Sequence, residues 1–515
     1  MVKADNTENS YRSIIRRISA FGGVQIFNIL VNLARGKFVA LILGPAGMGV
    51  SSLFTTSSAI IQQLGSLGLN LSIVKETAAA KDQPGVLHTV LHVARRLILL
   101  TSLLGALVCI LLSPWLSRLT FGNYDYTFGF ILLGIAVALS ICGAGYLALL
   151  QGLGDIRRLS KASIVGSLTG LLCGVPLYYF FGTSGIVPAM IILSLAVTAF
   201  YYFSFRKSEH LPAPADADLA ATDINLRDHL PLIRKLISLG IVFMIGTLVG
   251  SAVNYLINTF IRWQGSLSDV GLFQGANSLT NQYMGIVFSA LAMDYFPRIS
   301  AIASDAVKLR HIVNRQSELV MLIATPIVML VIVLAPVAIR MLLSDAFLSI
   351  IPLLRWLAMG VLLQGISFPL GYLFLAKDNK KIYIWLEVVS GNIIWFATSA
   401  GGYYLFGLNG LGIALVARTI IDILLNYLIC RRYYAFDYTP RTILTLLLCT
   451  LTATIVFLLT LHSPAISTLH SSAISTSSIL SITSDPLTTS IIWMLLLTTI
   501  LTAILRLRHL LRSNS

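Results

Sequence analysis

The chain has 515 residues, of which 56% are hydrophobic and 11% are charged, and its mean hydropathy is +0.85. This composition excludes a water-soluble globular domain and is typical of a polytopic membrane protein. A net charge of +15 would favour a nucleic-acid partner in a soluble chain, whereas in a membrane protein basic residues first indicate topology. The five cysteines lie in hydrophobic segments without metal-ligand spacing, so we expect no disulfide framework, no metal site and no cofactor.

Hydrophobic runs separated by charge clusters or Gly/Pro turns predict an all-α polytopic membrane protein with about fourteen transmembrane helices. The expected spans, in chain order, are 18–43, 48–74, 97–113, 127–150, 160–181, 185–205, 236–261, 270–296, 316–336, 350–376, 382–405, 409–430, 442–461 and 486–505. The stretch 85–96 is expected to lead into the third span along the membrane surface.

The Lys and Arg residues are distributed unevenly between the two sides that these spans define. Most of the 36 lie in the N-terminal segment and in every second connection after it. The opposite side receives only Arg118, Arg262, Arg340 and Arg355. Because cytoplasmic loops are enriched in Lys and Arg, we predict that both termini lie in the cytoplasm. The same distribution accounts for the net charge and removes the argument for nucleic acid.

Two motifs occur twice in the chain at nearly the same separation. Gly-Tyr-Leu at 145–147 recurs at 371–373, and Tyr-Tyr-Phe-Phe-Gly at 178–182 recurs as Tyr-Tyr-Leu-Phe-Gly at 403–407. Each copy contains six spans, an even number, so both copies have the same orientation in the membrane. This predicts two parallel six-helix lobes related by a pseudo-two-fold axis along the membrane normal.

The repeat divides the chain into four parts. These are an N-lobe at 1–205, a cytoplasmic linker at 206–235, a C-lobe at 236–433 and two extra helices at 434–515. The linker is rich in Pro, Ala and Asp, which is typical of a connection between domains.

Four of the expected spans carry polar residues at helical spacing, so each has one polar face. The first has Gln25, Asn28, Asn32 and Arg35; the second has Thr55, Ser58 and Gln62; the seventh has Thr247, Ser251, Asn254 and Asn258; and the eighth has Gln274, Asn277 and Asn281. We expect these faces to line one cavity between the lobes, because polar groups that face lipid are costly. The alternative is that they hydrogen-bond neighbouring helices as packing contacts.

Two basic residues lie inside the first span. Arg35 is either a cavity charge that attracts an anion or one member of a structural ion pair. Lys37 would point almost oppositely on an ideal helix, unless a kink at Gly36 brings both side chains inward.

Three acidic residues and one more basic residue lie in or near later spans. The twelfth span contains Arg418 and, one turn later, Asp422, and an intrahelical ion pair is the favoured interpretation. Asp294 and Glu387 lie within a turn or two of the cytoplasmic boundary and are either interfacial anchors or proton-linked groups. Arg418 is a further candidate for anion binding, and the three acids are the candidates for ion coupling.

The sequence contains no constellation that an enzyme would need. The outer loops are short, have no paired carboxylates at useful spacing, and no Walker motif is present. We therefore expect a protein that is not an enzyme, and a membrane-embedded glycan polymerase or ligase is disfavoured.

Several motifs resemble those of one family. Gly-Pro-Ala-Gly-Met-Gly at 44–49, Phe-Gly-Asn-Tyr-Asp-Tyr at 121–126, Phe-Gln-Gly at 273–275 and Gly-Tyr-Leu-Phe-Leu-Ala-Lys at 371–377 look like Wzx-type lipid-linked oligosaccharide flippases. The most similar members are those that translocate the lipid-linked unit of the enterobacterial common antigen. The family belongs to the multidrug/oligosaccharidyl-lipid/polysaccharide exporter superfamily and usually has twelve helices. The two extra helices resemble those of the fourteen-helix lipid II flippases.

The resemblance implies a multi-pass protein of the bacterial inner membrane that flips an undecaprenyl-pyrophosphate-linked oligosaccharide, an O-antigen or related repeat unit, to the periplasmic leaflet by alternating access. Membrane lipids and polysaccharide polymerase and chain-length proteins would be its partners. The candidate substrate-binding residues are Arg35, Lys37, Asn28, Asn32, Gln62, Asn254, Asn258, Gln274, Asn277, Asn281 and Arg418. Basic residues would attract the pyrophosphate, and Asn and Gln would hydrogen-bond the sugars. The alternative is a drug or cation exporter of the same superfamily.

Overall fold

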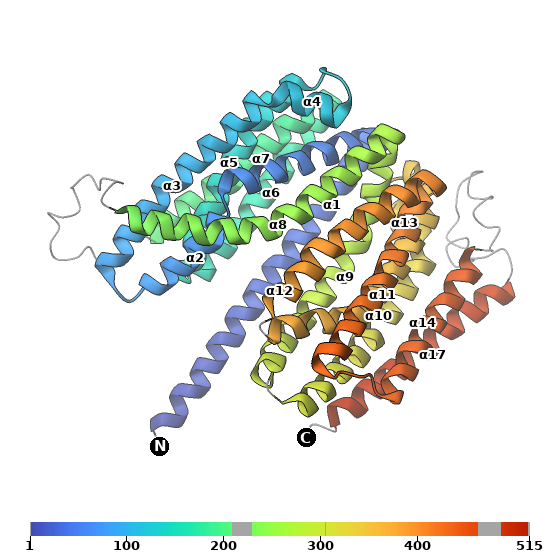
Figure 1. Cartoon of the computed structure of the whole chain (residues 1–515). Helices are drawn as coiled ribbons and strands as arrows, with labels where there is room; N and C mark the ends of the chain where they lie inside the picture. The colour runs from blue at the N-terminus through green and yellow to red at the C-terminus, as the bar shows by residue number, and fades with distance from the viewer. Residues whose placement is uncertain (1, 209–228, 304, 378, 462–485, 513–515) are drawn as a thin grey trace. The chain divides into compact units, whose positions relative to one another are not determined.

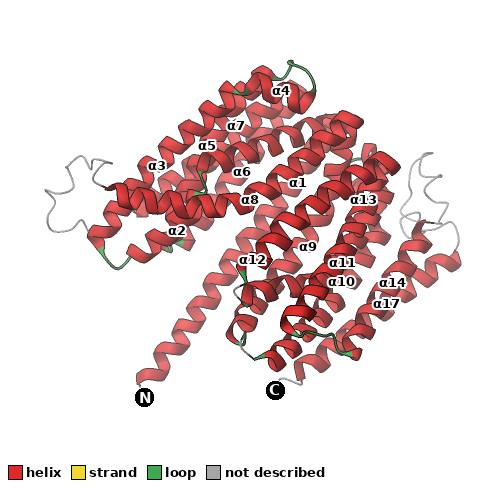
Figure 2. Ribbon diagram, viewed as in Figure 1, coloured by secondary structure: helices red, strands yellow, loops and turns green. Residues whose placement is uncertain are grey.

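The computed structural model describes residues 2–208, 229–303, 305–377, 379–461 and 486–512. All regular secondary structure in these ranges is helical (Figure 2), which confirms the predicted all-α class. The chain forms two compact units, Met1–Val270 and Gly271–Ser515, each of which has its own packing.

Unit 1 contains eight α-helices, the short helix η1 and the first residues of α9, drawn from blue to green in Figure 1. Its helices are α1 (Val2–Ser66), α2 (Leu69–Ala80), α3 (Pro84–Leu111), α4 (Ser113–Phe121), α5 (Thr127–Leu153), α6 (Ile156–Phe181), η1 (Gly182–Gly185), α7 (Ile186–Ser208) and α8 (Leu230–Gln264). The expected surface stretch at 85–96 is part of α3, which runs without a break into the third expected span.

Unit 2 contains the rest of α9 and the helices that follow it. They are α9 (Leu267–Ala301), α10 (Ala306–Leu342), η4 (Asp345–Ile350), α11 (Ile351–Ala376), α12 (Lys380–Tyr383), the π-helical turn η5 (Ile384–Ser390), α13 (Gly391–Tyr434), α14 (Pro440–Leu461) and α17 (Pro486–Arg512). The two C-terminal helices, α14 and α17, pack against each other and against α10 (Figure 1).

Two of the long helices, α1 and α13, each join two expected spans at a glycine. The predicted bounds differ in part from the structure, because span 48–74 continues past the end of α1 at Ser66 into α2 and span 382–405 begins in α12 and η5. Gly44 in α1 has φ 65° and ψ −169°, and Gly407 in α13 has φ 59° and ψ −143°. A positive φ is easily reached only by glycine, so the chain turns at these points between spans 18–43 and 48–74 and between spans 382–405 and 409–430. In the described ranges nine stretches are long and apolar enough to cross a membrane, and three of them hold two expected spans each. The total of fourteen stays a prediction.

The repeated Tyr-Tyr-x-Phe-Gly motif has the same local structure in both copies. Gly182 has φ 58° and ψ −133°, close to the values of its counterpart Gly407. Three residues later the packing also repeats: a Cβ on Gly185 would lie 2.2 Å from the Leu177 carbonyl oxygen, and one on Gly410 would lie 1.8 Å from that of Gly402. Since neither position leaves room for a side chain, both copies of the turn require glycine. This local geometry supports the internal repeat.

Helix α8 packs within unit 1, against α1, α2 and α4. The repeat had placed the corresponding span, 236–261, at the start of the C-lobe, so the compact units and the repeat copies divide the chain at different points. A glycine pair brings the backbones together: a Cβ on Gly68 would lie 2.0 Å from the Gly240 carbonyl oxygen, and one on Gly240 would lie 2.4 Å from that of Leu67. Such close approach is typical of helix packing in membranes, where small residues replace the hydrophobic driving force.

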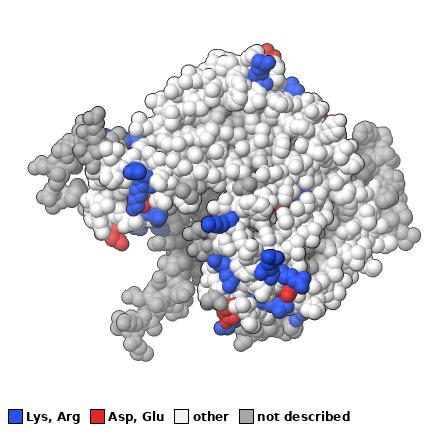
Figure 3. All heavy atoms as spheres, in the orientation of Figure 1, with Lys and Arg blue, Asp and Glu red and all other residues white. Residues whose placement is uncertain are grey.

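The outer surface agrees with a membrane environment. On the face shown in Figure 3, Lys and Arg atoms gather in a few places and wide areas between them carry no charge. Large apolar side chains such as Leu103, Leu172 and Phe180 are mostly exposed, which water would disfavour but lipid would not. The protein is therefore a multi-pass membrane protein.

Candidate functional site

The polar face of α1 is used partly for packing inside unit 1. The Asn28 Nδ2 donates to Ser163 Oγ of α6 at 2.8 Å, and its Oδ1 accepts from Ser167 Oγ of the same helix at 3.0 Å. Both ends of this amide are therefore occupied, as expected for a contact that joins two helices. Asn32, one turn further, is exposed.

Arg35 and Lys37 are half-buried and lie on different sides of α1. The only non-helical residue within α1 is Gly44, so the helix is regular at Gly36 and the suggested kink there is wrong. Residues two positions apart on a regular helix are rotated by about 200° around its axis. The Arg35 and Lys37 side chains therefore leave the helix in almost opposite directions. Within the described ranges neither side chain forms an ion pair. Arg35 thus lacks the acidic partner that a structural role would require.

The second half of α1 meets α8 through a face next to the predicted one. Gln62 Nε2 donates to Ser58 Oγ of its own helix at 2.7 Å. The residues that reach α8 are instead Gln63, whose Oε1 accepts from Thr247 Oγ1 at 2.9 Å, and Ser52, whose Oγ accepts from Asn258 Nδ2 at 3.4 Å. The periodicity that identified Gln62 also allowed this neighbouring face, because the sequence does not define how far a helix is rotated toward its partner.

Two of the predicted residues on α8 have different environments. Asn258 is only 3% exposed, and its Oδ1 has no hydrogen-bond partner among the described residues. Asn254 is exposed, so its amide is open to solvent or to a ligand.

Polar contacts also hold both ends of α8 to unit 1. At one end the Lys235 ammonium lies 2.7 Å from a Glu76 carboxylate oxygen of α2, and Glu76 is 7% exposed. At the other end Arg262 donates to the Phe121 carbonyl oxygen at 3.1 Å, and Trp263 Nε1 donates to that of Leu119 at 3.0 Å. The buried Glu76 carboxylate thus holds one end of α8, and backbone carbonyl groups at the end of α4 hold the other. Neither Glu76 nor Lys235 was singled out from the sequence.

The predicted residues on α9 differ in their environments. Gln274 and Asn277 are half-buried on this helix, and the Asn281 side chain lies outside the described residues. Asp294 forms an ion pair with Arg298, four residues later, at 2.8 Å, and both side chains are largely exposed. An exposed pair of this spacing favours the interpretation of Asp294 as an anchor near the end of the helix.

The charges of α13 form the expected intrahelical pair. Arg418 Nε lies 3.2 Å from Asp422 Oδ2, and the Arg418 guanidinium carbon lies 5.5 Å from the centre of the Trp395 ring. One turn beyond Asp422, the buried Asn426 donates to Ser367 Oγ of α11 at 3.4 Å. Arg418, Asp422 and Asn426 thus form a polar stripe at four-residue spacing, of which Asn426 was missed. Glu387 lies in the turn η5, and its side chain is outside the described residues.

The described ranges contain no group of three or more His, Cys, Asp or Glu side chains that could hold a metal ion. Unit 1 thus has polar residues on α1 and α8 together with the half-buried Arg35 and Lys37, and unit 2 has polar residues on α9 and α13. Side chains of these types can bind anions and hydroxyl groups.

Comparison with known proteins identifies the family. The model of a family described as polysaccharide biosynthesis protein matches residues 38–352. The chain belongs to this family. Polysaccharide biosynthesis proteins related to it include the lipid III flippase of Escherichia coli (strain K12), which is 26% identical over 370 residues, covering 70% of this chain and 85% of that protein. The lipid III flippase of Shigella flexneri matches to the same extent.

Solved structures with low sequence identity share the fold of this polysaccharide biosynthesis protein. An inward-facing multidrug resistance MATE family transporter has a TM-score of 0.64 and 18% identity, over 79% of this chain and 94% of that one. The lipid II flippase MurJ in an inward closed conformation has a TM-score of 0.63 and 13% identity, over 96% of this chain and 100% of that one. The family match and the two lipid III flippases confirm the predicted family resemblance, and these relatives are flippases.

Proposed function

We propose that this protein flips an undecaprenyl-pyrophosphate-linked oligosaccharide from the cytoplasmic to the periplasmic leaflet of the bacterial inner membrane. The family and the two relatives named as lipid III flippases support a lipid-linked saccharide as the substrate. The observation that carries the proposal is Arg35, a half-buried cation in an apolar helix that forms no ion pair with any described residue. Holding such a charge within a membrane is costly unless an anion compensates it in the working cycle.

The substrate class follows from the chemistry of the polar faces. A pyrophosphate offers the charge and the acceptor oxygens that Arg35 can bind in a bidentate manner. Lys37 leaves the other side of α1 and Arg418 is paired with Asp422, so the proposal rests on Arg35, with these two residues as secondary candidates for anion binding. Asn32 and Asn254 are exposed amides that can donate to and accept from sugar hydroxyls. Gln62, Asn258, Gln274, Asn277 and Asn281 complete the proposed set, and Asn28 supports α1 through α6.

Helix α8 is the proposed moving element of an alternating-access cycle. The Glu76–Lys235 pair holds one end of this helix and the Arg262 and Trp263 contacts with α4 hold the other, while Thr247 and Asn258 bond α1 between them. Opening one end of unit 1 requires the contacts at that end to break while the others remain. The distribution of Lys and Arg assigns the Glu76 end to the cytoplasm, together with both termini.

A drug or cation exporter is the second candidate, because the MATE transporters share this fold. A cationic substrate needs an acidic group that is free to receive it. Within the described ranges Asp294 is paired with Arg298 and Asp422 with Arg418, whereas Arg35 and Lys37 form no ion pair. This charge pattern favours an anionic substrate.

The test uses purified protein in liposomes that contain a fluorescent lipid-linked oligosaccharide. A membrane-impermeant quencher or lectin reports the fraction of probe in the outer leaflet. We expect the wild type to exchange the probe between leaflets, Arg35→Gln to lose most of that activity, and Arg432→Gln, an exposed Arg of α13, to keep it. Equal activity of Arg35→Gln and the wild type would remove Arg35 from the mechanism.

A further inference from the structure

Three helices of unit 2, α10, α14 and α17, line a cavity of about 240 Å³ that is open to the surface. Its wall carries one charged residue, Arg506 of α17. Six threonines line the rest of it together with apolar side chains, namely Thr325, Thr445, Thr452, Thr498, Thr499 and Thr502. None of these residues belongs to the polar faces described above, so the cavity needs its own explanation.

The threonine hydroxyls have no proton left to donate to a polar ligand. Each of the six donates to a carbonyl oxygen of its own helix three or four residues earlier; for example, Thr325 donates to Met321 at 2.7 Å and Thr452 to Leu448 at 2.9 Å. The wall of the cavity is mostly apolar and includes Leu322, Leu448 and Ala503 beside the threonines. Such a wall suits an alkyl chain and offers a saccharide few donors.

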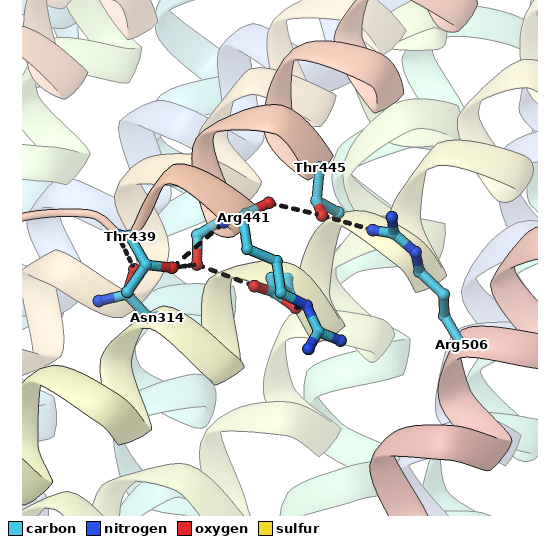
Figure 4. A network of polar contacts seen from close by, with 7 residues as sticks. Asn314, Thr439, Arg441, Thr445 and Arg506 are labelled. Atoms are coloured by element: carbon cyan, nitrogen blue, oxygen red, sulfur yellow. Dashed lines mark hydrogen bonds and ion pairs between the residues drawn. The ribbon is translucent and has the colours of Figure 1, made fainter.

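Arg506 gives one end of this apolar cavity a positive charge. Its guanidinium donates to Thr445 Oγ1 of α14 (Figure 4). The acid of the same polar network, Glu318 of α10, is 5% exposed, accepts from Thr442 Oγ1 at 2.8 Å and lies 3.8 Å from Arg441. Glu318 is therefore occupied, and within the described ranges Arg506 forms no ion pair. A guanidinium has five N–H donors, so Arg506 keeps donors for an anion.

The surroundings of Arg506 also favour an anion. Arg441 lies in the same network, at the start of α14 (Figure 4), where its charge offsets that of Glu318. The N-terminus of a helix carries a partial positive charge and attracts phosphate groups. Leu448, which lines the cavity, and the neighbouring Ile504 are both exposed, so the cavity opens where the protein meets lipid.

We infer that this cavity binds one anionic phospholipid of the surrounding leaflet, with its phosphate at Arg506 and part of one acyl chain against the apolar wall. At about 240 Å³ the cavity is larger than an apolar cavity of roughly 150 Å³ that holds a benzene molecule, so a segment of a single acyl chain fits. The distribution of basic residues assigns this end to the cytoplasmic leaflet. The lipid would fasten α17 to α10 and α14, and it is separate from the proposed substrate.

Thermal unfolding of the delipidated full-length protein in mild detergent tests this inference. Because a ligand of the native state raises the unfolding temperature, titration with phosphatidylglycerol should raise it, whereas phosphatidylcholine and inorganic phosphate should not. Native mass spectrometry should show one tightly retained phosphatidylglycerol. Equal effects of the two phospholipids, stabilisation by inorganic phosphate alone, or retention of undecaprenyl phosphate in preference to phosphatidylglycerol would each overturn the inference.

Variants of the cavity test the phosphate position at Arg506 and the acyl-chain position at Thr499 separately. Arg506→Gln should weaken phosphatidylglycerol binding about tenfold or more, with Arg506→Lys between it and the wild type, while Arg432→Gln should bind normally. Thr499→Phe should block binding because the ring fills the cavity, whereas Thr499→Val should bind normally because its hydroxyl serves only its own helix and Met329. If Arg506→Gln fails to fold, the lysine variant and the comparison of lipids on the wild type still decide. Unchanged binding in both Arg506→Lys and Thr499→Phe would contradict the inference.

Discussion

The ion pair between Glu76 of α2 and Lys235 of α8 leads to an asymmetric prediction. Glu76 is the buried member, since its side chain is 9% exposed against 57% for Lys235. Lys235→Met leaves a buried carboxylate without its partner, whereas Glu76→Gln leaves a lysine that water can still solvate. The first change should therefore destabilise the contact between α8 and α2 more than the second.

The size of the effect follows from burial. Removing one partner of a fully buried pair costs about 3–5 kcal/mol. Because Lys235 is more than half exposed, water replaces part of the interaction, so Lys235→Met should cost about 1–3 kcal/mol and Glu76→Gln less than about 1 kcal/mol. The double variant should resemble Glu76→Gln, since no charge then remains buried.

Hydrogen exchange of the α2 backbone amides measures this contact directly. A loss of about one to three kcal/mol corresponds to a roughly 5- to 150-fold larger open population, so α2 should exchange faster by a factor in that range in Lys235→Met. Lys75→Met, which removes an exposed lysine of the same helix, is the matched control and should leave exchange unchanged. A Glu76→Gln variant as destabilised as Lys235→Met, or unchanged exchange in Lys235→Met, would refute the reasoning.

Three further predictions concern packing and charge. Gly68→Ala should destabilise the protein by more than about 1 kcal/mol, because the new Cβ would lie 2.0 Å from a carbonyl oxygen of α8. The control Gly246→Ala places its Cβ in open space and should be neutral or stabilising, and thermal unfolding compares the two variants. Asn28→Leu should lower the unfolding temperature by removing two hydrogen bonds to α6 while transport per folded molecule persists, and loss of transport without loss of stability would instead place Asn28 at the substrate. Asp422→Asn should leave the liposome flipping rate largely unchanged if its carboxylate only pairs with Arg418, and a loss of proton- or sodium-dependent flipping would assign it to ion coupling.

Hydropathy and glycine placement predicted most of the helical architecture. Membrane-spanning helices are easy to predict from sequence, because lipid requires long apolar runs whose backbone groups are hydrogen-bonded within the segment. Gly44 and Gly407 mark turns between expected spans, and the two copies of the tyrosine-rich motif have nearly the same backbone angles at Gly182 and Gly407. Helix α4 was not predicted, since its nine residues are too short to show a clear apolar period.

The site was harder to predict because a polar residue in a span can serve either packing or binding. Periodicity placed Asn28 on a polar face but did not show that α6 presents serines to both ends of its amide. It identified Gln62 where Gln63 makes the contact with α8, because rotation of a helix is decided by its neighbours. The Arg418–Asp422 pair was predicted correctly, since a spacing of four residues within one helix needs no tertiary information. Whether the exposed amides contact substrate stays a prediction.

Flipping of a fluorescent lipid-linked oligosaccharide by Arg35 variants in liposomes tests the central claim most directly. The account predicts probe exchange by the wild type, partial activity of Arg35→Lys, and at least a roughly tenfold lower rate in Arg35→Gln, about 1.4 kcal/mol or more of lost stabilisation, with equal insertion of all three. A wild type that moves no more probe than empty liposomes, that elongates the saccharide, or that exports only cationic drugs would contradict it.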